Sequence, residues 1–273
     1  MVAESLFATV FPSRCRLCRT SLTNIFRLPV CQPCLAGMRP LSGGLCSICG
    51  ERLLSPYALL SGPADPQCGL CQRLAPPFSK AVAYGSYDSG LRDLIHLLKY
   101  EQVRPAAVVL GKMLAHAISR LEVYGTGSRF TIVPVPLHSR KLRQRGFNQS
   151  ELIVQEAVKV TPGNDRIKLE LGILRRRRET VSQTGLTRHQ RGENIRGAFA
   201  LLRPERIAGR NVVLVDDVFT TGTTVSECAR VLLRAGARKI YVATVARTLK
   251  ADATNENLVR MIEPGAKALR AAG

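Results

Sequence analysis

Hydrophobic residues follow two different periods in the part of the chain beyond residue 80. Short, nearly continuous apolar runs, typical of strands buried on both faces of a parallel sheet, lie at 81–87, 130–136, 212–215 and 239–246. Apolar positions spaced three and four residues apart, as in amphipathic helices, lie at 89–100, 105–124, 148–160 and 224–236. The alternation predicts an α/β fold, a parallel sheet flanked by helices.

The remaining segments follow neither period. Residues 174–199 are polar and basic, which predicts a long loop with strand ends, and a loop of that length in a compact domain is more often functional than idle. Residues 1–78 are rich in Cys, Pro and Gly. We therefore expect three parts, a small cysteine-rich domain at 10–74, the α/β domain at 79–250 and a flexible tail at 251–273.

Charge is the strongest feature of the composition. The chain carries 40 basic and 20 acidic side chains, a formal charge of +20. Between Leu137 and Arg210 there are 17 Lys/Arg and 7 Asp/Glu. A surface of this kind attracts polyanions such as nucleic acid, phosphorylated metabolites or anionic lipid. The alternative is a solvated basic surface without a partner.

The sequence offers no candidate for a membrane span, because no run of about 18 apolar residues occurs. The start of the chain, MVAESLFATVFPSRC, has an acid where a signal peptide has basic residues, and its apolar run is short. These features favour a cytoplasmic protein.

Eight of the nine cysteines form four Cys-x-x-Cys pairs. The pairs are Cys15/Cys18, Cys31/Cys34, Cys46/Cys49 and Cys68/Cys71. Each pair can direct two thiolates at one ion, and two pairs make the closed four-thiolate site that suits structural zinc. The spacing predicts two Zn²⁺ ions in two consecutive zinc ribbons. Because so small a segment has little core, metal binding should provide its folding energy.

Two alternatives remain open for the cysteines. A cross-braced arrangement would join the first pair with the third, and spacing alone does not separate it from sequential pairing. A redox dithiol is the other alternative, although four pairs in tandem favour metal. Disulfides do not persist in a reducing cytoplasm. The ninth cysteine, Cys228, lies on the apolar face of a predicted helix and is expected in the core.

The stretch VVLVDDVFTTGTT at 212–224 joins a strand, two acids and a hydroxyl-rich turn that leads into a helix. With the strand ending at Val215, Asp216 and Asp217 lie at its carboxyl end, where open α/β sheets bind ligands. The following helix start offers free backbone N–H groups to a phosphate, and Gly222 allows a close approach. The turn is not a P-loop, since Gly-Lys-Ser/Thr is absent. We expect a sugar phosphate here rather than an incidental pair of acids in an exposed turn.

This stretch closely resembles the 5-phosphoribosyl-1-pyrophosphate (PRPP) motif of type I phosphoribosyltransferases. The resemblance implies that Asp216 and Asp217 hold the ribose 2′- and 3′-hydroxyls and that Mg²⁺ accompanies the pyrophosphate. The residues that would surround the 5-phosphate are Phe219, Thr220, Thr221, Gly222, Thr223 and Thr224.

A second resemblance covers about Cys15 to Arg247. The paired four-cysteine sites, VPVPLHSRKLRQRGFNQSELI at 133–153 and RRRRETVSQTGLTRHQRGENIRGAF at 175–199 are similar to the ComF family. That family is related to competence proteins and is often labelled amidophosphoribosyltransferase-like. The comparison implies phosphate-facing roles for Arg140 and Arg145. The candidates in the loop that closes over the substrate are Thr180, Gln183 and Arg191.

Two functions follow from these resemblances. The first is a phosphoribosyltransferase, a glycosyltransferase that moves phosphoribosyl from Mg-PRPP to a nitrogen acceptor, with free ammonia or a nucleobase favoured because the chain has no glutaminase domain. The second is a competence-related protein that takes up or processes single-stranded DNA and uses the fold to bind phosphoribosyl or nucleic acid. The Asp-Asp motif favours the first, and the charge of +20 favours the second.

Overall fold

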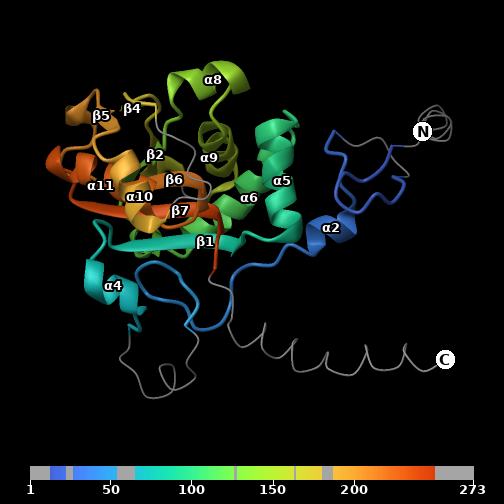
Figure 1. Cartoon of the computed structure of the whole chain (residues 1–273), viewed down its shortest axis with the longest axis horizontal. Coiled ribbons are helices and arrows are strands. Elements are labelled where there is room, and N and C mark those ends of the chain that lie inside the picture. Colours follow the sequence, from blue (N-terminus) through green and yellow to red (C-terminus); the bar gives the residue numbers. More distant parts are fainter. Residues whose placement is uncertain are drawn as a thin grey trace, which may run out of the picture.

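The centre of the chain is a five-stranded parallel sheet of order β1-β7-β6-β2-β3 (Figure 1). The computed structural model describes residues 13–22, 27–53, 65–125, 128–162, 164–179 and 187–249. The sheet strands are β1 (Lys80–Ser86), β2 (Phe130–Pro134), β3 (Ile167–Leu169), β6 (Asn211–Phe219) and β7 (Lys239–Arg247). The predicted parallel α/β fold is confirmed.

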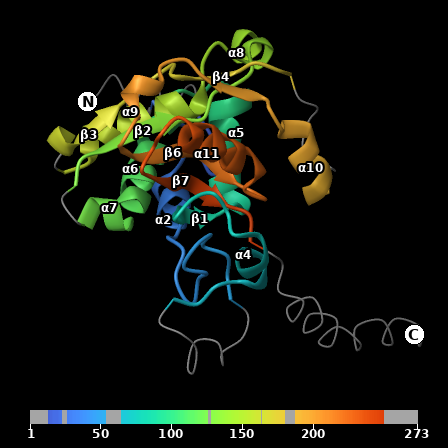
Figure 2. The ribbon, with the colours of Figure 1, turned by 90° about the vertical axis from the view of Figure 1, so that its left-hand side faces the viewer.

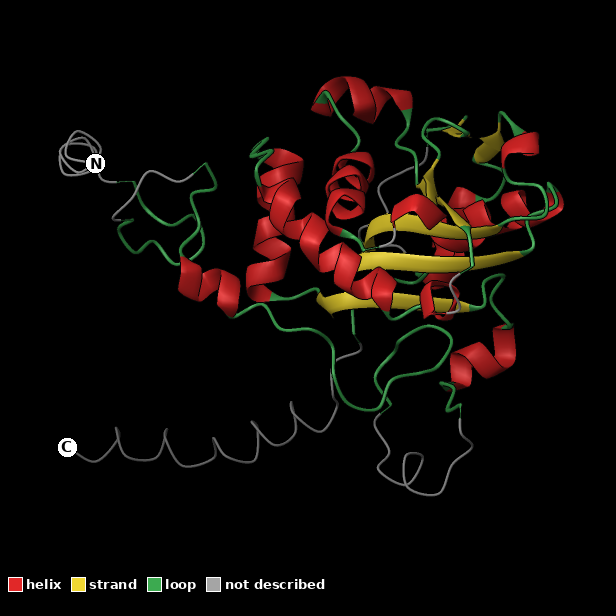
Figure 3. Cartoon of the chain, turned by 180° about the vertical axis from the view of Figure 1, so that it is seen from behind, coloured by secondary structure: helices red, strands yellow, loops and turns green. Residues whose placement is uncertain are grey.

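Helices cover both faces of the sheet, as Figure 3 shows. The helices on one face are α5 (Ser89–Tyr100), α6 (Ala106–Ser119) and α9 (Gln149–Val160), and α11 (Thr223–Arg234) lies on the other. In β6, Val213 and Val215 join the core formed with α6 and α9, while Val212 and Leu214 join the core formed with α11. Burial on both faces explains why this strand is continuously apolar.

One predicted helix and one predicted strand end at different residues in the structure. The helix expected at 105–124 ends at Ser119, and a short α7 (Glu122–Gly125) follows. The strand expected at 212–215 continues through both aspartates to Phe219, because its ladder with β7 extends as far as Phe219 and Arg247. Apolarity alone could not predict this extension, since hydrogen bonding to a neighbouring strand does not require an apolar side chain.

The basic segments contain more regular structure than their sequence predicts. Residues 174–199 begin in β4 (Leu174–Arg176) and end at the start of β5 (Phe199–Leu201), which pair antiparallel, so the expected strand ends are confirmed. The helix between them, α10 (Arg188–Ile195), is not predicted. A capping box of Thr187 and Gln190 starts α10, which packs on α11. The basic stretch after β2 forms α8 (Ser139–Arg145), which ends at Gly146 in the left-handed conformation.

A topological switch point lies between β2 and β6. From β2 the chain runs through α9 to β3, and from β6 it runs through α11 to β7, so neighbouring strands lead to opposite faces and opposite edges of the sheet. In open α/β sheets a crevice forms at the carboxyl ends of two such strands, and ligands bind there. The fold thus places Asp216 and Asp217 beside the natural binding crevice.

The two cysteine modules lie in different places around the sheet (Figures 1 and 2). The first, with α2 (Gln32–Ala36), packs beside α5 and shares its core. The second, with α4 (Gly69–Leu74), lies below the edge strand β1, where the Ala81 backbone N–H donates to the Ile48 carbonyl at 2.6 Å. Both modules therefore share hydrophobic cores with the α/β domain.

The remaining elements are short. Two 3₁₀ helices, η1 (Asn164–Arg166) and η2 (Pro204–Arg206), precede β3 and β6. Within the described part of the chain, none of the helices has the length and apolarity that crossing a bilayer requires.

Candidate functional site

A pocket of about 430 Å³ opens at the switch point between β2 and β6. Its walls come from the end of β1, from α5, from the segment after β2, from α9 and from the β6–α11 connection. The polar and charged side chains that line it are Tyr87, Lys99, Lys141, Gln149, Arg176, Arg191, Asp216, Asp217, Thr220, Thr223 and Thr224. Predicted site residues thus meet side chains from several distant segments.

The two adjacent carboxylates have different partners. Asp217 is buried, forms an ion pair with the Lys99 ammonium and accepts a hydrogen bond from Gln149 Nε2 at 3.1 Å. Asp216 is partly open to the pocket, and its Oδ1 accepts from Ser150 Oγ at 3.0 Å and from the Asp217 backbone N–H at 2.9 Å. Asp217 is therefore neutralised by a cation, whereas Asp216 is held by neutral donors.

These surroundings shift the pKa values of Asp216 and Asp217 in opposite directions. Burial, and then the neighbouring Asp217 carboxylate, raise the pKa of Asp216 to about 7. Burial would also raise the pKa of Asp217, but the Lys99 charge and the hydrogen bonds from Lys99 and Gln149 outweigh it and lower that pKa. Burial opposes the charge on Lys99, yet Asp217 raises the pKa of its ammonium. An ionised Asp217–Lys99 pair thus lies beside an aspartate that titrates near neutrality.

The raised pKa predicts that Asp216→Asn stabilises the protein at alkaline pH. The folded protein binds more protons at Asp216 than the unfolded chain does between about pH 4 and pH 7, so its stability falls across that window. Asparagine cannot ionise, and its amide oxygen can still accept from Ser150. Urea unfolding from pH 5 to 8 should show a free energy of unfolding that exceeds the wild-type value by an amount growing with pH, to about 4 kcal/mol above pH 7. A gain that shrinks as pH rises would contradict the raised pKa.

The threonine loop, residues 220–224, joins β6 to α11. Gly222 caps α11 with φ +75°, and a Cβ at this position would lie 2.6 Å from Cζ of Phe219. The Phe219 ring is buried beneath the glycine, so its side chain supports the loop. Arg191 of α10 reaches the loop, with NH1 3.5 Å from Thr220 Oγ1. The loop thus presents hydroxyls, a helix N-terminus and an arginine to the pocket.

A methyl group at Gly222 should distort the threonine loop. Gly222→Ala combines a left-handed backbone with a clash against Phe219, and we expect at least roughly tenfold weaker binding of a phosphorylated ligand. Gly209→Ala is the matched control, because Gly209 has φ +68° but nothing within 4 Å of the added Cβ. Calorimetric titration of both variants measures the difference. Equal losses would assign the effect to backbone strain in general and not to the loop.

Basic side chains surround the carboxylates. Lys141 of α8 and Arg176 of β4 line the pocket. Burial lowers the pKa of both groups. Positive neighbours, Arg176 first, lower the pKa of Lys141 further, whereas nearby Asp216 partly offsets the effect of burial on Arg176. Arg145 donates to Gln149 and so connects to Asp217 through that amide. Cations that destabilise one another's charge favour binding of a polyanion.

One predicted arginine lies elsewhere. Arg140 is exposed and pairs with Glu179 at 3.3 Å, outside the pocket lining, whereas Lys141 lines the pocket. The reason is that the segment is helical, and consecutive residues on a helix point in different directions. Two further predicted residues, Thr180 and Gln183, fall outside the described residues. The structure therefore brings together the aspartates, the threonine loop, Arg191 and, through Gln149, Arg145.

Lys99 is a functional candidate that the motifs of the sequence do not predict. It lies four residues after the fully buried Ile95, on the inner side of α5, where a lysine is unusual. A lysine at a buried helix position indicates a buried ion pair, although the sequence does not identify which acid pairs with Lys99. Gln149 and Ser150 are likewise buried polar residues at the start of α9, and both bind the aspartate pair.

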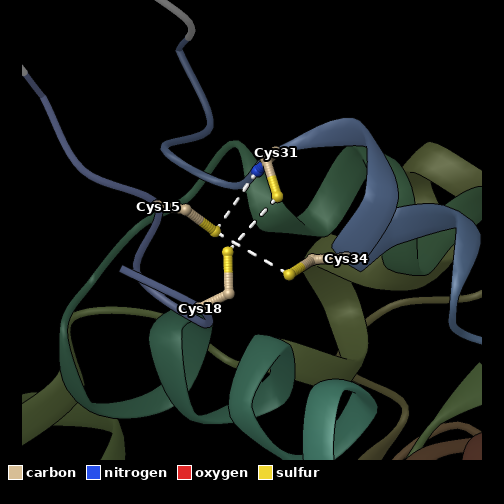
Figure 4. A group of neighbouring side chains, drawn as sticks. All are labelled: Cys15, Cys18, Cys31 and Cys34. Carbon is tan, nitrogen blue, oxygen red and sulfur yellow. Dashed lines mark hydrogen bonds between the residues drawn. The ribbon is translucent and has the colours of Figure 1, made fainter. Parts of the chain in front are cut away.

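The eight paired cysteines form two four-sulfur groups. The first tetrad is Cys15, Cys18, Cys31 and Cys34 (Figure 4), and the second tetrad is Cys46, Cys49, Cys68 and Cys71. Within each, all sulfur atoms lie within 4.8 Å of one another. The order is sequential, so the cross-braced alternative is not found. Cys228 is separate, fully buried in α11 as expected.

Both tetrads fit a tetrahedral zinc ion. Sulfur atoms at ~2.3 Å from one Zn²⁺ lie ~3.8 Å apart. The Cys15–Cys34, Cys18–Cys31 and Cys49–Cys68 sulfur distances are 3.9, 3.5 and 3.7 Å. The backbone N–H of Cys31 donates to the Cys15 sulfur at 3.4 Å, and that of Cys68 donates to the Cys46 sulfur at 3.2 Å. These donors stabilise thiolates, the form that binds metal.

A larger pocket of about 1380 Å³ lies on the other side of the threonine loop. It runs between the second cysteine module, α10 and α11, and it shares Phe219, Thr220, Gly222 and Thr223 with the first pocket. Arginines on its walls include Arg191, Arg196, Arg230 and Arg234. The threonine loop is thus the boundary between a small polar pocket and a larger groove.

Comparison with known proteins connects this site to a family. The model of the phosphoribosyl transferase domain matches residues 157–263. "DNA utilization protein YhgH" of Escherichia coli (strain K12) is 34% identical over 213 residues, 76% of this chain and 91% of that protein. "Competence protein F" of Haemophilus influenzae is 30% identical over 224 residues, 80% of this chain and 96% of that protein.

Among solved structures, the glutamine PRPP amidotransferase from B. subtilis, complexed with ADP and GMP, is 25% identical with a TM-score of 0.33. The match covers 51% of this chain and 26% of that enzyme, so the chain spans about a quarter of its length. The fold assignment rests on the strand order and on the domain family. The two relatives, the domain match and the two cysteine tetrads show that the chain belongs to the ComF family of competence-related proteins with a phosphoribosyltransferase-type domain.

Proposed function

We propose that the chain binds PRPP with Mg²⁺ in the pocket between β2 and β6 and transfers its phosphoribosyl group to a nitrogen acceptor. The observation that supports this most strongly is the placement of two adjacent carboxylates, a threonine loop and a helix N-terminus around one pocket. Carboxylates accept hydrogen bonds from vicinal hydroxyls, and the loop with its helix start binds a phosphate. A ribose that carries a 5-phosphate has both groups.

The basic side chains of the pocket can stabilise pyrophosphate, the leaving group of the proposed reaction. In the proposed reaction a bond forms between the acceptor nitrogen and C1, and the bond from C1 to the pyrophosphate oxygen breaks. Pyrophosphate leaves with the electron pair, and the acceptor nitrogen loses a proton. Lys141, Arg176 and Arg145 provide positive charge near the carboxylates to stabilise the departing anion. Arg191 would help to hold the 5-phosphate at Thr220.

The pocket also suits magnesium. Mg²⁺ binds proteins through one or two carboxylates together with substrate phosphates. Asp216 and Asp217 are the carboxylates among the described residues that line this pocket. When bound, the ion would disperse the negative charge of the pyrophosphate. Thr180 and Gln183 stay proposed members of a loop that closes over the substrate and excludes water.

Calorimetric titration of the zinc-loaded protein with PRPP and Mg²⁺ tests the binding step. We expect one site per chain and loss of heat when Mg²⁺ is left out. Incubation with ammonia or with individual nucleobases, followed by an assay of released pyrophosphate, tests transfer. An absence of PRPP binding would overturn the proposal.

Binding of single-stranded DNA is a second candidate function, favoured by the groove beyond the threonine loop and by the names of the relatives. The groove begins at the proposed 5-phosphate position, where the backbone of a longer nucleotide chain would continue. Exposed basic residues also occur on α8 and β4, the elements whose Lys141 and Arg176 line the first pocket. The YhgH and competence protein F relatives are named for DNA utilization and competence.

Such DNA binding should be mainly electrostatic, because the chain has no Trp and only 5% aromatic residues for stacking on bases. We expect the logarithm of the binding constant to fall with the logarithm of salt concentration with a slope of about −3, at roughly −0.7 per phosphate contacted. Fluorescence anisotropy with a labelled oligonucleotide from 50 to 300 mM salt measures it. A flat salt response would contradict this candidate function.

We propose the cytoplasm as the compartment. All nine cysteines are free thiols in the described residues, and eight of them gather in two metal-type groups. Thiols in this arrangement persist where the environment is reducing.

A further inference from the structure

Arg247, the last residue of β7, is a buried cation beside the second tetrad. Its Nη1 donates to the backbone carbonyl of Cys49, and its Nη2 lies 2.8 Å from Glu51 Oε2 and 3.7 Å from the Cys49 sulfur. Both partners belong to the second cysteine module, whereas Arg247 belongs to the central sheet. The guanidinium therefore connects a predicted zinc ligand to the α/β domain.

The same guanidinium also contacts the support of the threonine loop. Its central carbon lies 4.7 Å from the centre of the Phe219 ring, and the two residues are paired in the β6–β7 ladder. The Phe219 ring lies directly beneath Gly222. Phe78, which follows α4 of the cysteine module, packs edge-on against the same ring at 6.1 Å. The contacts form an unbroken path from Cys49 through Arg247 and Phe219 to Gly222.

We propose that Arg247 is a positioning residue that couples zinc binding in the second tetrad to the shape of the threonine loop. Four thiolates around Zn²⁺ leave a net charge of about −2, which a buried guanidinium stabilises. Loss of the metal frees the Cys49 turn from its place in the tetrad, so the guanidinium loses its contacts with the Cys49 carbonyl and sulfur. Phe219 then loses its packed position, and Gly222 loses its support. The part of this inference that concerns PRPP rests on the proposed function.

The test compares Arg247→Met and Arg247→Lys with the wild-type full chain. Arg247→Lys keeps a buried positive charge opposite Glu51 but lacks the second guanidinium nitrogen, so it cannot contact both the carbonyl and the sulfur of Cys49. This variant therefore tests the proposal even if Arg247→Met fails to fold. Arg210→Met is the matched control, because Arg210 is an exposed arginine next to the amino end of β6, at the opposite end of the sheet.

Two readouts do not depend on PRPP. Zinc release to a chromogenic chelator should become biphasic in Arg247→Met and Arg247→Lys, with one of two ions leaving at least about tenfold faster. Amide hydrogen exchange of the peptide spanning residues 218–226 should speed up by a similar factor in both variants. It should also speed up in wild-type protein stripped of zinc. Arg210→Met should match the wild type in both measurements.

Two outcomes would overturn the proposal. Faster zinc release with unchanged exchange in residues 218–226 would confine Arg247 to the metal site, and no change in either measurement would make it a packing residue. If wild-type protein fails to bind Mg-PRPP, the proposed function fails, yet exchange and zinc release still decide the coupling. If PRPP binds, the Arg247 variants should bind it about tenfold more weakly, while Arg210→Met keeps wild-type affinity.

Discussion

Replacing both Asp216 and Asp217 by asparagine is expected to abolish binding of Mg-PRPP while the chain stays folded. In the proposed complex each carboxylate accepts a hydrogen bond from a ribose hydroxyl, and such charge-assisted bonds contribute roughly 2 kcal/mol each. Losing both should weaken binding about a thousandfold. Calorimetry of the wild type and the double variant measures this, with circular dichroism as the check on folding.

The two single variants should differ in stability, because the two carboxylates have different partners. Asp217→Asn removes the counter-charge of Lys99, whose side chain is only 16% exposed, and should destabilise the protein. Asp216→Asn removes a group that ionises only near pH 7 and should stabilise it at alkaline pH. The opposing effects explain why the double variant is expected to fold.

A second double variant separates the effect of the unpaired Lys99 charge from the loss of ligand contacts. Lys99→Met combined with Asp217→Asn removes both members of the buried pair and should regain stability over Asp217→Asn alone, without regaining PRPP affinity. An unfolded double aspartate variant would show that the carboxylates have a structural role. Unchanged PRPP affinity in that variant would contradict the proposed site.

The sheet could be predicted from the sequence because its strands are buried on both faces. Val212 to Val215 form a continuous apolar run for this reason, and the helices around it show one apolar side each. Segments that depend less on apolar burial are harder to predict. Helix α10 is polar along most of its length and starts at a capping box, so its sequence has no apolar period to detect.

The residues of the candidate site also fall into a group that the sequence predicts and a group that it does not. Asp216, Asp217 and the threonine loop lie within nine residues of one another in the chain, and their order by itself indicates a ligand. Lys99, Gln149 and Ser150 reach the carboxylates from other elements, through contacts that only the packing of α5 and α9 against the sheet creates. Local motifs identify one wall of a pocket, whereas the opposite wall requires the tertiary structure.

The second large effect concerns the two cysteine tetrads and the unequal burial of their last ligands. Cys34 and Cys71 are the last ligands of their tetrads, and each is the third residue of a short helix, α2 or α4. Cys71 is buried in the core that also contains Phe219, whereas Cys34 is half-buried at the edge of the other core. The same substitution at both positions therefore compares the two modules directly.

Cys71→Ser is expected to remove one of two zinc ions and to lower the free energy of unfolding by about 4 kcal/mol or more, a size typical of the loss of a structural metal. Cys34→Ser should also lose one zinc ion but lower stability less, because Cys34 is only half-buried whereas Cys71 is buried. Metal analysis and urea unfolding measure both effects. PRPP affinity should fall only in Cys71→Ser, since that tetrad contacts the support of the threonine loop through Arg247. One zinc ion per wild-type chain would contradict the double site, and equal losses of stability would contradict the role given to the unequal burial of Cys34 and Cys71.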